Sequence, residues 1–193
     1  MSTNKATNKS ADPQQLVQYI KQAGPAPVHL WDPPFCGDMD MRIAADGQWF
    51  YRGSPLGRLA MVKLFASVLK REGDEYFLVT PVEKLRIQVD DCPFVATVME
   101  NSGKDEQQIL RFTTNVGDTV TADADHPLQV DINAQGEPHP ILEIRRGLKA
   151  LVNRNVFYRL VDMAQQGPDG DKQQLGVYSS GRFFSLGRLP AGG

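Results

Sequence analysis

The 193-residue chain has few of the residues that build metal centres and disulfide scaffolds. Its two cysteines, Cys36 and Cys92, lie far apart and form no CxxC arrangement. Zinc sites built on cysteine pairs and frameworks of several disulfides are therefore excluded, although a single disulfide stays open. The three histidines, His29, His126 and His139, are scattered, and two of them stand in proline-flanked segments, so a histidine-rich metal site is not expected.

The chain also lacks long apolar segments and an excess of positive charge. No stretch approaches the roughly 20 apolar residues of a spanning helix, and the polar N-terminus has no signal-peptide core. We therefore expect no membrane span and a cytoplasmic protein. The net charge of −2 provides no general attraction for nucleic acid, which is not an expected partner. Phosphate-loop, dinucleotide and serine-hydrolase motifs are absent as well.

The first half of the chain indicates a hairpin, a helix and a second hairpin. Residues 1–27 are predicted to form a disordered tail and a short helix. Asp46-Gly47 then separates two β-like runs, which predicts strands over about 38–44 and 48–52. Apolar residues at helical spacing predict a helix over 54–73, and two further strands follow it.

The second half is predicted to be rich in strands. "FVATVMEN" and "QQILRFTTN" flank "SGKDE" and indicate a hairpin, and several further strands follow. Residues 148–167 show an amphipathic pattern that predicts a second helix. The chain closes on a hairpin that turns at Ser180-Gly181.

The order of these elements repeats. Residues 42–80 and 128–178 both indicate strand, glycine turn, strand, helix and strand, with Gly47 matching Gly136 and Gly57 matching Gly147. We therefore predict an α+β protein of duplicated β-β-α-β units. Its N-terminal domain is expected over 28–91 and its C-terminal domain over 92–193.

The stretch "FCGDMDMRI" predicts a strand with two different faces. Because strand side chains alternate, the two methionines and Ile43 should enter the core. Asp38, Asp40 and Arg42 should then lie on the opposite face. The two aspartates could line a cleft and pair with Arg42 or Arg58, contact a ligand, or hold a metal ion.

Several motifs resemble one bacterial family. They are "HLWDPPFCGDMDMRIAADGQWFYRGSPLGR", "YFLVTPVEK", "TNVGD", "ADADHPL" and "GLKALVNRNVFY". They are similar to the family catalogued as domain of unknown function 1285, from about Val28 to Gly187. The resemblance implies a duplicated two-domain α+β protein whose C-terminal half is a pleckstrin-homology-like β-barrel with a helix. It also implies a ligand-binding region between the halves and a role in signalling or ligand binding, with no established reaction.

Eleven residues are candidates for lining a ligand-binding cleft between the two domains. They are Asp38, Asp40, Arg42, Trp49, Tyr51, Arg58, Lys84, Asn115, Asp123, His126 and Arg145. The arginines could converge on an anion at a helix start, or they could be solvated surface residues. Trp49 and Tyr51 could stack on a planar ligand or pack in the core. Lys84 could bind an anion or pair with Glu83.

The leading hypothesis is a non-enzymatic cytoplasmic ligand-binding or regulatory module, with a role in signal transduction. Its partner would be a small anionic ligand or a protein segment, and no cofactor, catalytic residue or metal ligand is assigned. The alternative is a metal-assisted hydrolase that uses Asp38, Asp40, Asp123 and His126, although His126 could simply be a turn residue. A nucleic-acid-binding protein is the third alternative. The oligomeric state stays open.

Overall fold

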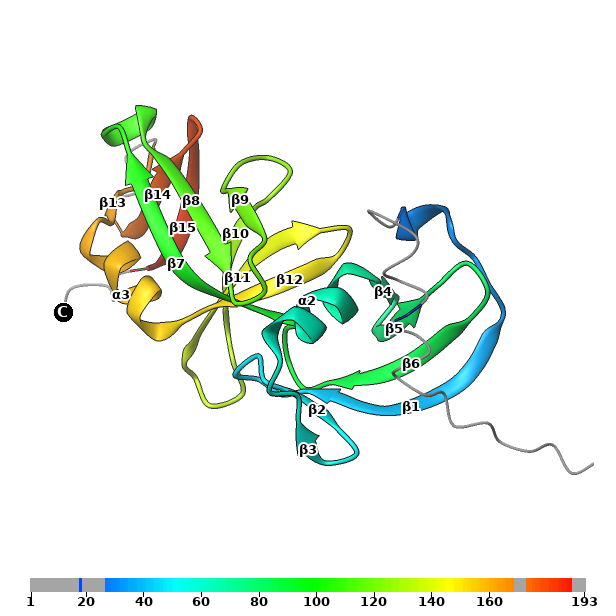
Figure 1. Ribbon diagram of the computed structural model, residues 1–193. Coiled ribbons are helices and arrows are strands. Elements are labelled where there is room, and N and C mark those ends of the chain that lie inside the picture. The colour runs from blue at the N-terminus through cyan, green and yellow to red at the C-terminus, as the bar shows by residue number, and fades with distance from the viewer. Residues whose placement is uncertain (1–17, 19–26, 169–172, 189–193) are drawn as a thin grey trace, which may run out of the picture. The chain divides into compact units, whose positions relative to one another are not determined.

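The computed structural model describes residue 18 and residues 27–168 and 173–188 (Figure 1). The predicted tail and first helix therefore lie almost wholly outside the described residues. The chain divides into two compact units: Met1–Arg42 with Trp49–Gln88, and Ile43–Gln48 with Val89–Gly193. Within the described ranges, no helix has the length and apolar character needed to cross a membrane.

The first unit contains one six-stranded sheet in the order β3-β2-β1-β6-β5-β4. Its strands are β1 (Phe35–Ile43), β2 (Trp49–Tyr51), β3 (Ser54–Pro55), β4 (Leu69–Glu72), β5 (Glu75–Val79) and β6 (Lys84–Val89). A short 3₁₀ turn, η1 (Val28–Leu30), precedes the sheet, and the helix α2 (Leu59–Ser67) connects β3 to β4. The hairpin predicted around Gly47 is confirmed, and so is the second predicted hairpin, whose strands β5 and β6 flank Pro81.

The core of this unit follows from the alternation of β1 and the apolar side of α2. Met39 and Met41 are 6% and 2% exposed, while Asp40 between them is exposed, as the strand pattern predicts. The Trp49 ring stacks on Phe65 of α2 with 6.4 Å between ring centroids. This packing places the apolar side of the helix on the buried face of the sheet.

The first helix is shorter than predicted. Residues 54–55 form β3, and residues 69–72 form β4, which pairs with β5 in antiparallel register. Gly73, with φ of 60°, makes the tight turn between these two strands. The predicted helix is confirmed over Leu59–Ser67, but its predicted limits at 54 and 73 were wrong. At the C-terminal limit, hairpin pairing with β5 outweighs the local helical spacing.

The second unit contains a curled six-stranded sheet and a three-stranded sheet. The larger sheet has the order β10-β11-β12-β7-β8-β9, and the smaller one has the order β13-β14-β15. The strands are β7 (Phe94–Ser102), β8 (Ile109–Thr114), β9 (Thr119–Thr121), β10 (Leu128–Ile132), β11 (Pro138–Arg145), β12 (Leu148–Val152), β13 (Gln165–Gln166), β14 (Gln174–Ser179) and β15 (Arg182–Arg188). The 3₁₀ turn η2 (Asp105–Gln107) connects β7 to β8, and the helix α3 (Arg154–Asp162) follows β12.

Hydrogen bonds attach the terminal hairpin to the larger sheet. The hydroxyl of Ser179, which is fully buried, accepts from Leu110 N at 2.9 Å, and Gln108 Nε2 donates to Tyr178 O at 2.9 Å. β12 runs parallel to β7, whereas the other strand pairs in this unit are antiparallel. The larger sheet forms a half-barrel, and its likeness to a pleckstrin-homology barrel stays a prediction.

The second helix is also shorter than predicted. Residues 148–152 form β12, and their burial alternates strictly along the strand. α3 begins only after Asn153, whose side chain accepts a hydrogen bond from Val156 N at 2.9 Å and so caps the helix. The prediction of a helix from residue 148 was wrong because apolar residues at 148, 150 and 152 fit a strand period as well as a helical one.

The two halves share strands and one helix each, so the predicted α+β duplication is confirmed. Gly47 and Gly136 occupy the same position in two equivalent turns, because the N–H group of each donates to the carbonyl three residues earlier at 2.9 Å. The match of Gly57 to Gly147 was wrong. The counterpart of Gly147 is Gly53, because Arg52-Gly53 and Arg146-Gly147 both turn with positive φ at both residues.

Candidate functional site

Asp38 forms a surface ion pair with a partner that the sequence did not suggest. Its carboxylate accepts from Arg86 Nε at 2.6 Å and from Arg86 Nη2 at 3.2 Å, and Arg86 also donates to Glu75 at 2.5 Å. The hydrogen bond from Arg86 lowers the pKa of Asp38 below its ordinary value. The pair crosses from β1 to β6, so only strand order, and not spacing in the sequence, brings it together.

Asp40 and Arg42 do lie together, in a shallow hollow of 200 Å³ on the first unit. Phe50, Gly53 and Gln88 complete its lining, and the Arg42 guanidinium lies 5.9 Å from the centre of the Phe50 ring. Arg58 precedes α2 as an exposed residue and does not line this hollow. The hollow is too small to bury a typical small-molecule ligand.

The remaining predicted residues of the first unit have structural surroundings. Trp49 is 1% exposed, so its ring is not available to a ligand. Tyr51 is half-buried, with the Arg52 guanidinium 5.2 Å from its ring centre. Lys84 pairs with Glu72 at 2.9 Å rather than with Glu83. This hydrogen bond raises the pKa of Lys84 and lowers the pKa of Glu72.

The predicted residues of the second unit mostly hold turns in place. Asn115 accepts from Val95 N at 3.0 Å and donates to Gly47 O at 3.2 Å. The Asp123 carboxylate accepts from the His126 backbone N–H at 2.9 Å, and His126 Nδ1 lies 3.1 Å away. Arg145 pairs with Asp118.

The four residues of the predicted metal-assisted site do not form one cluster within either unit. Asp38 and Asp40 belong to the first unit, whereas Asp123 and His126 belong to the second. In the described part of the chain, one group of three metal-ligating side chains has converging ligand atoms, and it consists of other residues: Asp91, Cys92 and His139. The cleft between the domains stays a prediction.

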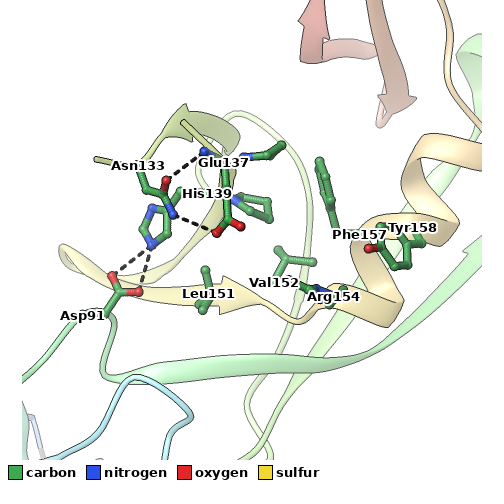
Figure 2. A pocket seen from close by; sticks show the side chains of 11 residues that line it. Asp91, Asn133, Glu137, His139, Leu151, Val152, Arg154, Phe157 and Tyr158 are labelled. Atoms are coloured by element: carbon green, nitrogen blue, oxygen red, sulfur yellow. Dashed lines mark hydrogen bonds and ion pairs between the residues drawn. The ribbon is translucent and has the colours of Figure 1, made fainter. Parts of the chain in front are cut away.

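The second unit has a larger pocket of 440 Å³ that lies within the size range of small-molecule sites. Its lining comes from β11, β12, α3 and the segments before β7 and β11, and comprises Asp91, Asn133, Glu137, Pro138, His139, Pro140, Leu151, Val152, Arg154, Phe157 and Tyr158. Figure 2 shows Asp91 and His139 at one end, Arg154, Phe157 and Tyr158 at the other, and Leu151 and Val152 between them.

Local sequence explains how these side chains are placed. Asn133 Oδ1 accepts from Gln135 N at 3.0 Å and Glu137 N at 2.8 Å, which holds the turn between β10 and β11. In the antiparallel register of β10 and β11, the backbone of His139 lies opposite that of Asp131. The Asn153 cap ends β12 and starts α3, so Leu151 of the strand and Arg154 of the first helical turn line the same pocket.

The charges in the pocket differ in how they are compensated. His139 Nε2 lies 3.0 and 2.9 Å from the two carboxylate oxygens of Asp91. Glu137 accepts from Asn133 Nδ2 at 3.4 Å. Arg154 is exposed and makes no ion pair with any residue that the structure describes. The pocket therefore combines an apolar floor with one cation, Arg154, and one carboxylate, Glu137, neither of which has an ion-pair partner among the described residues.

None of the eleven predicted residues lines this pocket. His139 stands between two prolines and Cys92 has no CxxC partner, so the local sequence does not predict that either residue is a ligand. The sequence does contain a signal, since Asp91-Cys92 stands just before β7, whose first three residues are buried, and His139 follows the second glycine turn. That signal becomes specific only when the strand order is known.

Comparisons with known proteins agree on one family. The N-terminal domain model of DUF1285, a domain of unknown function, matches residues 26–92, and the C-terminal domain model matches residues 93–186. The chain is similar to a DUF1285 family protein from Silicibacter pomeroyi DSS-3, with 50% identity and a TM-score of 0.87 over 93% of this chain and 97% of that one.

A second solved structure, a DUF1285 family protein from Shewanella baltica OS155, is 31% identical. Its TM-score is 0.52, with 65% of this chain and 92% of that chain covered. The search of curated proteins found no match. The two family models together span most of the chain, and the Silicibacter relative shares half of its aligned residues. The chain therefore belongs to the DUF1285 family.

Proposed function

We propose that this protein is a non-enzymatic ligand-binding module whose second unit takes a small organic anion in the 440 Å³ pocket. The observation that carries the proposal is Arg154, an exposed cation with no ion-pair partner in the described chain, next to an apolar floor. A guanidinium binds carboxylate and phosphate groups through two parallel hydrogen bonds. The ligand would therefore carry an anionic group and an apolar or planar part.

The apolar part of the ligand would contact side chains on two elements. Leu151 and Val152 of β12 form the floor, and Phe157 of α3 adds an aromatic ring. Most small-molecule sites have this composition, with a largely apolar lining and a few polar groups that orient the ligand. A regulatory role in signal transduction, which the family resemblance suggested, and a cytoplasmic location are part of the same proposal.

A series of three probes with one ring and different charges tests this proposal. Benzoate, benzyl alcohol and benzamidine present an anion, a neutral group and a cation on the same ring. Each would be titrated into metal-free protein while amide shifts of Leu151, Val152 and Phe157 are followed by NMR. We expect benzoate to bind most tightly, with shifts that saturate at these three residues.

The matched variants are Arg154→Gln and Arg182→Gln. Arg182 is exposed in the second unit and does not line the pocket, so its replacement should leave benzoate binding unchanged. Arg154→Gln should weaken benzoate binding about tenfold, which corresponds to ~1.4 kcal/mol, because a charge-assisted hydrogen bond is lost. Tighter binding of benzamidine than of benzoate would overturn the proposal, because Glu137 and Asp91 would then set the charge preference.

A further inference from the structure

The bend between β6 and β7 and the start of β11 bring three different metal-ligating groups together. His139 Nε2 lies 2.9 Å from Asp91 Oδ2, and Cys92 Sγ lies 3.7 Å from Asp91 Oδ1. One ligand atom from each of the three side chains lies within 4.8 Å of the other two. We propose that Asp91, Cys92 and His139 bind a divalent transition metal, with Zn²⁺ the best match.

The distances suit zinc with little rearrangement. Zinc binds sulfur at about 2.3 Å and imidazole nitrogen or carboxylate oxygen at about 2.0–2.2 Å. Tetrahedral geometry with these bonds separates the ligand atoms by roughly 3.3–3.8 Å. Measured to one oxygen, Asp91 Oδ1, His139 Nε2 at 3.0 Å lies slightly below this range and Cys92 Sγ at 3.7 Å lies within it, so small side-chain rotations would admit the ion.

The types of donor atom narrow the choice of metal. Calcium and magnesium take oxygen ligands, whereas a thiolate, an imidazole and a carboxylate together are typical of zinc and its substitute cobalt. Cys92 is 6% exposed and lies two residues before β7, so the packing around it restricts the positions that its sulfur can take. The side chains of His139 and Asp91 are 26% and 29% exposed, which leaves a path for the ion to enter.

The arrangement leaves one coordination position open. Asp91 and His139 line the 440 Å³ pocket, whereas Cys92 is buried and does not. A metal held by these three groups would therefore have its fourth position toward the pocket, where water or a ligand atom could bind. Three protein ligands and an open position distinguish such a site from a closed structural zinc site.

Cobalt titration of metal-free protein tests the site directly, with no organic ligand present. A thiolate that binds Co²⁺ gives a charge-transfer band in the near ultraviolet, and tetrahedral Co²⁺ gives intense visible bands. We expect both at one equivalent of Co²⁺, and we expect Zn²⁺ to displace them. No thiolate band in the wild-type protein would overturn the proposal.

The two cysteines provide a matched pair of variants. Cys92→Ser should abolish the charge-transfer band, whereas Cys36→Ser should retain it, because Cys36 is exposed and lies in β1. A band that survives Cys92→Ser and disappears in Cys36→Ser would refute the assignment. If Cys92→Ser does not fold, His139→Gln serves instead, with His126→Gln as its control. His139→Gln should weaken Zn²⁺ binding at least about 100-fold, and unchanged affinity would overturn the proposal.

The metal-site proposal and the anion-pocket proposal can be refuted independently. Cobalt binding requires only Asp91, Cys92 and His139, whereas benzoate binding to metal-free protein depends on Arg154. If the wild-type protein shows no cobalt bands but binds benzoate, only the metal-site proposal is refuted. If both are present, added Zn²⁺ should leave the effect of Arg154→Gln on benzoate binding unchanged, because Arg154 lies at the opposite end of the pocket from Asp91 and His139.

Discussion

Two turns, one from each copy of the duplicated sequence pattern, share a backbone conformation but differ in burial, although both belong to the second unit. In residues 44–48 and 133–137, the first N–H donates to the last carbonyl at 2.9 Å and the glycine N–H donates to the first carbonyl at 2.9 Å. The glycine φ is 84° at Gly47 and 79° at Gly136. Gly47 is nevertheless buried against Asn115 and Val95, whereas Gly136 is exposed.

The difference shows how a duplicated backbone acquires different roles. The first turn has become a packing element, since Asn115 donates to Gly47 O and accepts from Val95 N. The second turn is held by its own Asn133 side chain and contributes Asn133 and Glu137 to the pocket. The same local geometry thus packs against Asn115 and Val95 in one copy and contributes to the lining of the 440 Å³ pocket in the other.

Replacing each glycine with alanine should give the largest difference in stability between the two turns. A Cβ at residue 47 would lie 2.7 Å from Asn115 Nδ2 and 2.9 Å from Val95 Cγ2, whereas a Cβ at residue 136 would meet nothing within 4 Å. Gly47→Ala should therefore lower the free energy of unfolding by about 2–4 kcal/mol, from positive φ and overpacking together. Gly136→Ala should cost only about 1 kcal/mol, from φ alone. Urea unfolding measures both, and equal losses would contradict the comparison.

Asn115→Ala should have the next largest effect. It leaves Val95 N–H and Gly47 C=O without their side-chain partner, so we expect a loss of about 1–3 kcal/mol in the free energy of unfolding. The double variant with Gly47→Ala should lose less than the sum of the two, because one of the two atoms that block the new Cβ, Asn115 Nδ2, is gone while Val95 Cγ2 remains. Strict additivity in a urea double-mutant cycle would show that Asn115 does not constrain the first turn.

The polar side chains of the turns give a smaller contrast. Asn133 accepts from two backbone N–H groups, while Asp46 in the first turn accepts from Gln48 N alone, at 2.9 Å. Asn133→Ala should cost about 1 kcal/mol and Asp46→Ala about 0.5 kcal/mol, because each exposed side-chain bond contributes little. Thermal unfolding of the two variants shows which loses more stability. A larger loss for Asp46→Ala than for Asn133→Ala would contradict the prediction.

The smallest expected effect is a pH dependence at a third turn, which Asp123 holds. Burial alone would raise the pKa of Asp123, but hydrogen bonds from the His126 N–H, the His126 imidazole and the Asp125 N–H outweigh it and lower the pKa below its ordinary value. The ionised carboxylate is thus favoured in the folded state. Its stabilisation is present above the unfolded pKa and is lost as the pH falls through the lowered folded pKa.

The measurement is an NMR titration of the Asp123 carboxyl carbon, together with acid unfolding of Asp123→Asn. We expect a midpoint below the ordinary aspartate pKa of 3.8. We also expect the variant to lose less stability than the wild type as the pH falls from about 4 to about 2, where the carboxylate takes up its proton. A midpoint above the ordinary value would contradict the hydrogen-bonded turn.

Local patterns in the sequence identified the hairpins but not the helix limits. Glycine turns at Gly47, Gly136 and Ser180-Gly181 fall where the sequence places them, because positive φ restricts the choice of residue. The segments 69–72 and 148–152 fit a helical pattern in the sequence, yet they are strands. Short apolar runs fit both periods, and only the neighbouring strand, β5 for one and β7 and β11 for the other, decides between them.

The sequence by itself determined the α+β class, the duplicated order of elements and the two faces of β1. All three depend on interactions between residues close in the chain. Only the tertiary structure decided which side chains meet: Asp38 with Arg86, Asn115 with Gly47, and His139 with Asp91, each 48 or more residues apart. Strand order and packing bring these pairs together, and no local spacing encodes them, so the pocket and the proposed metal site emerge only in the folded chain.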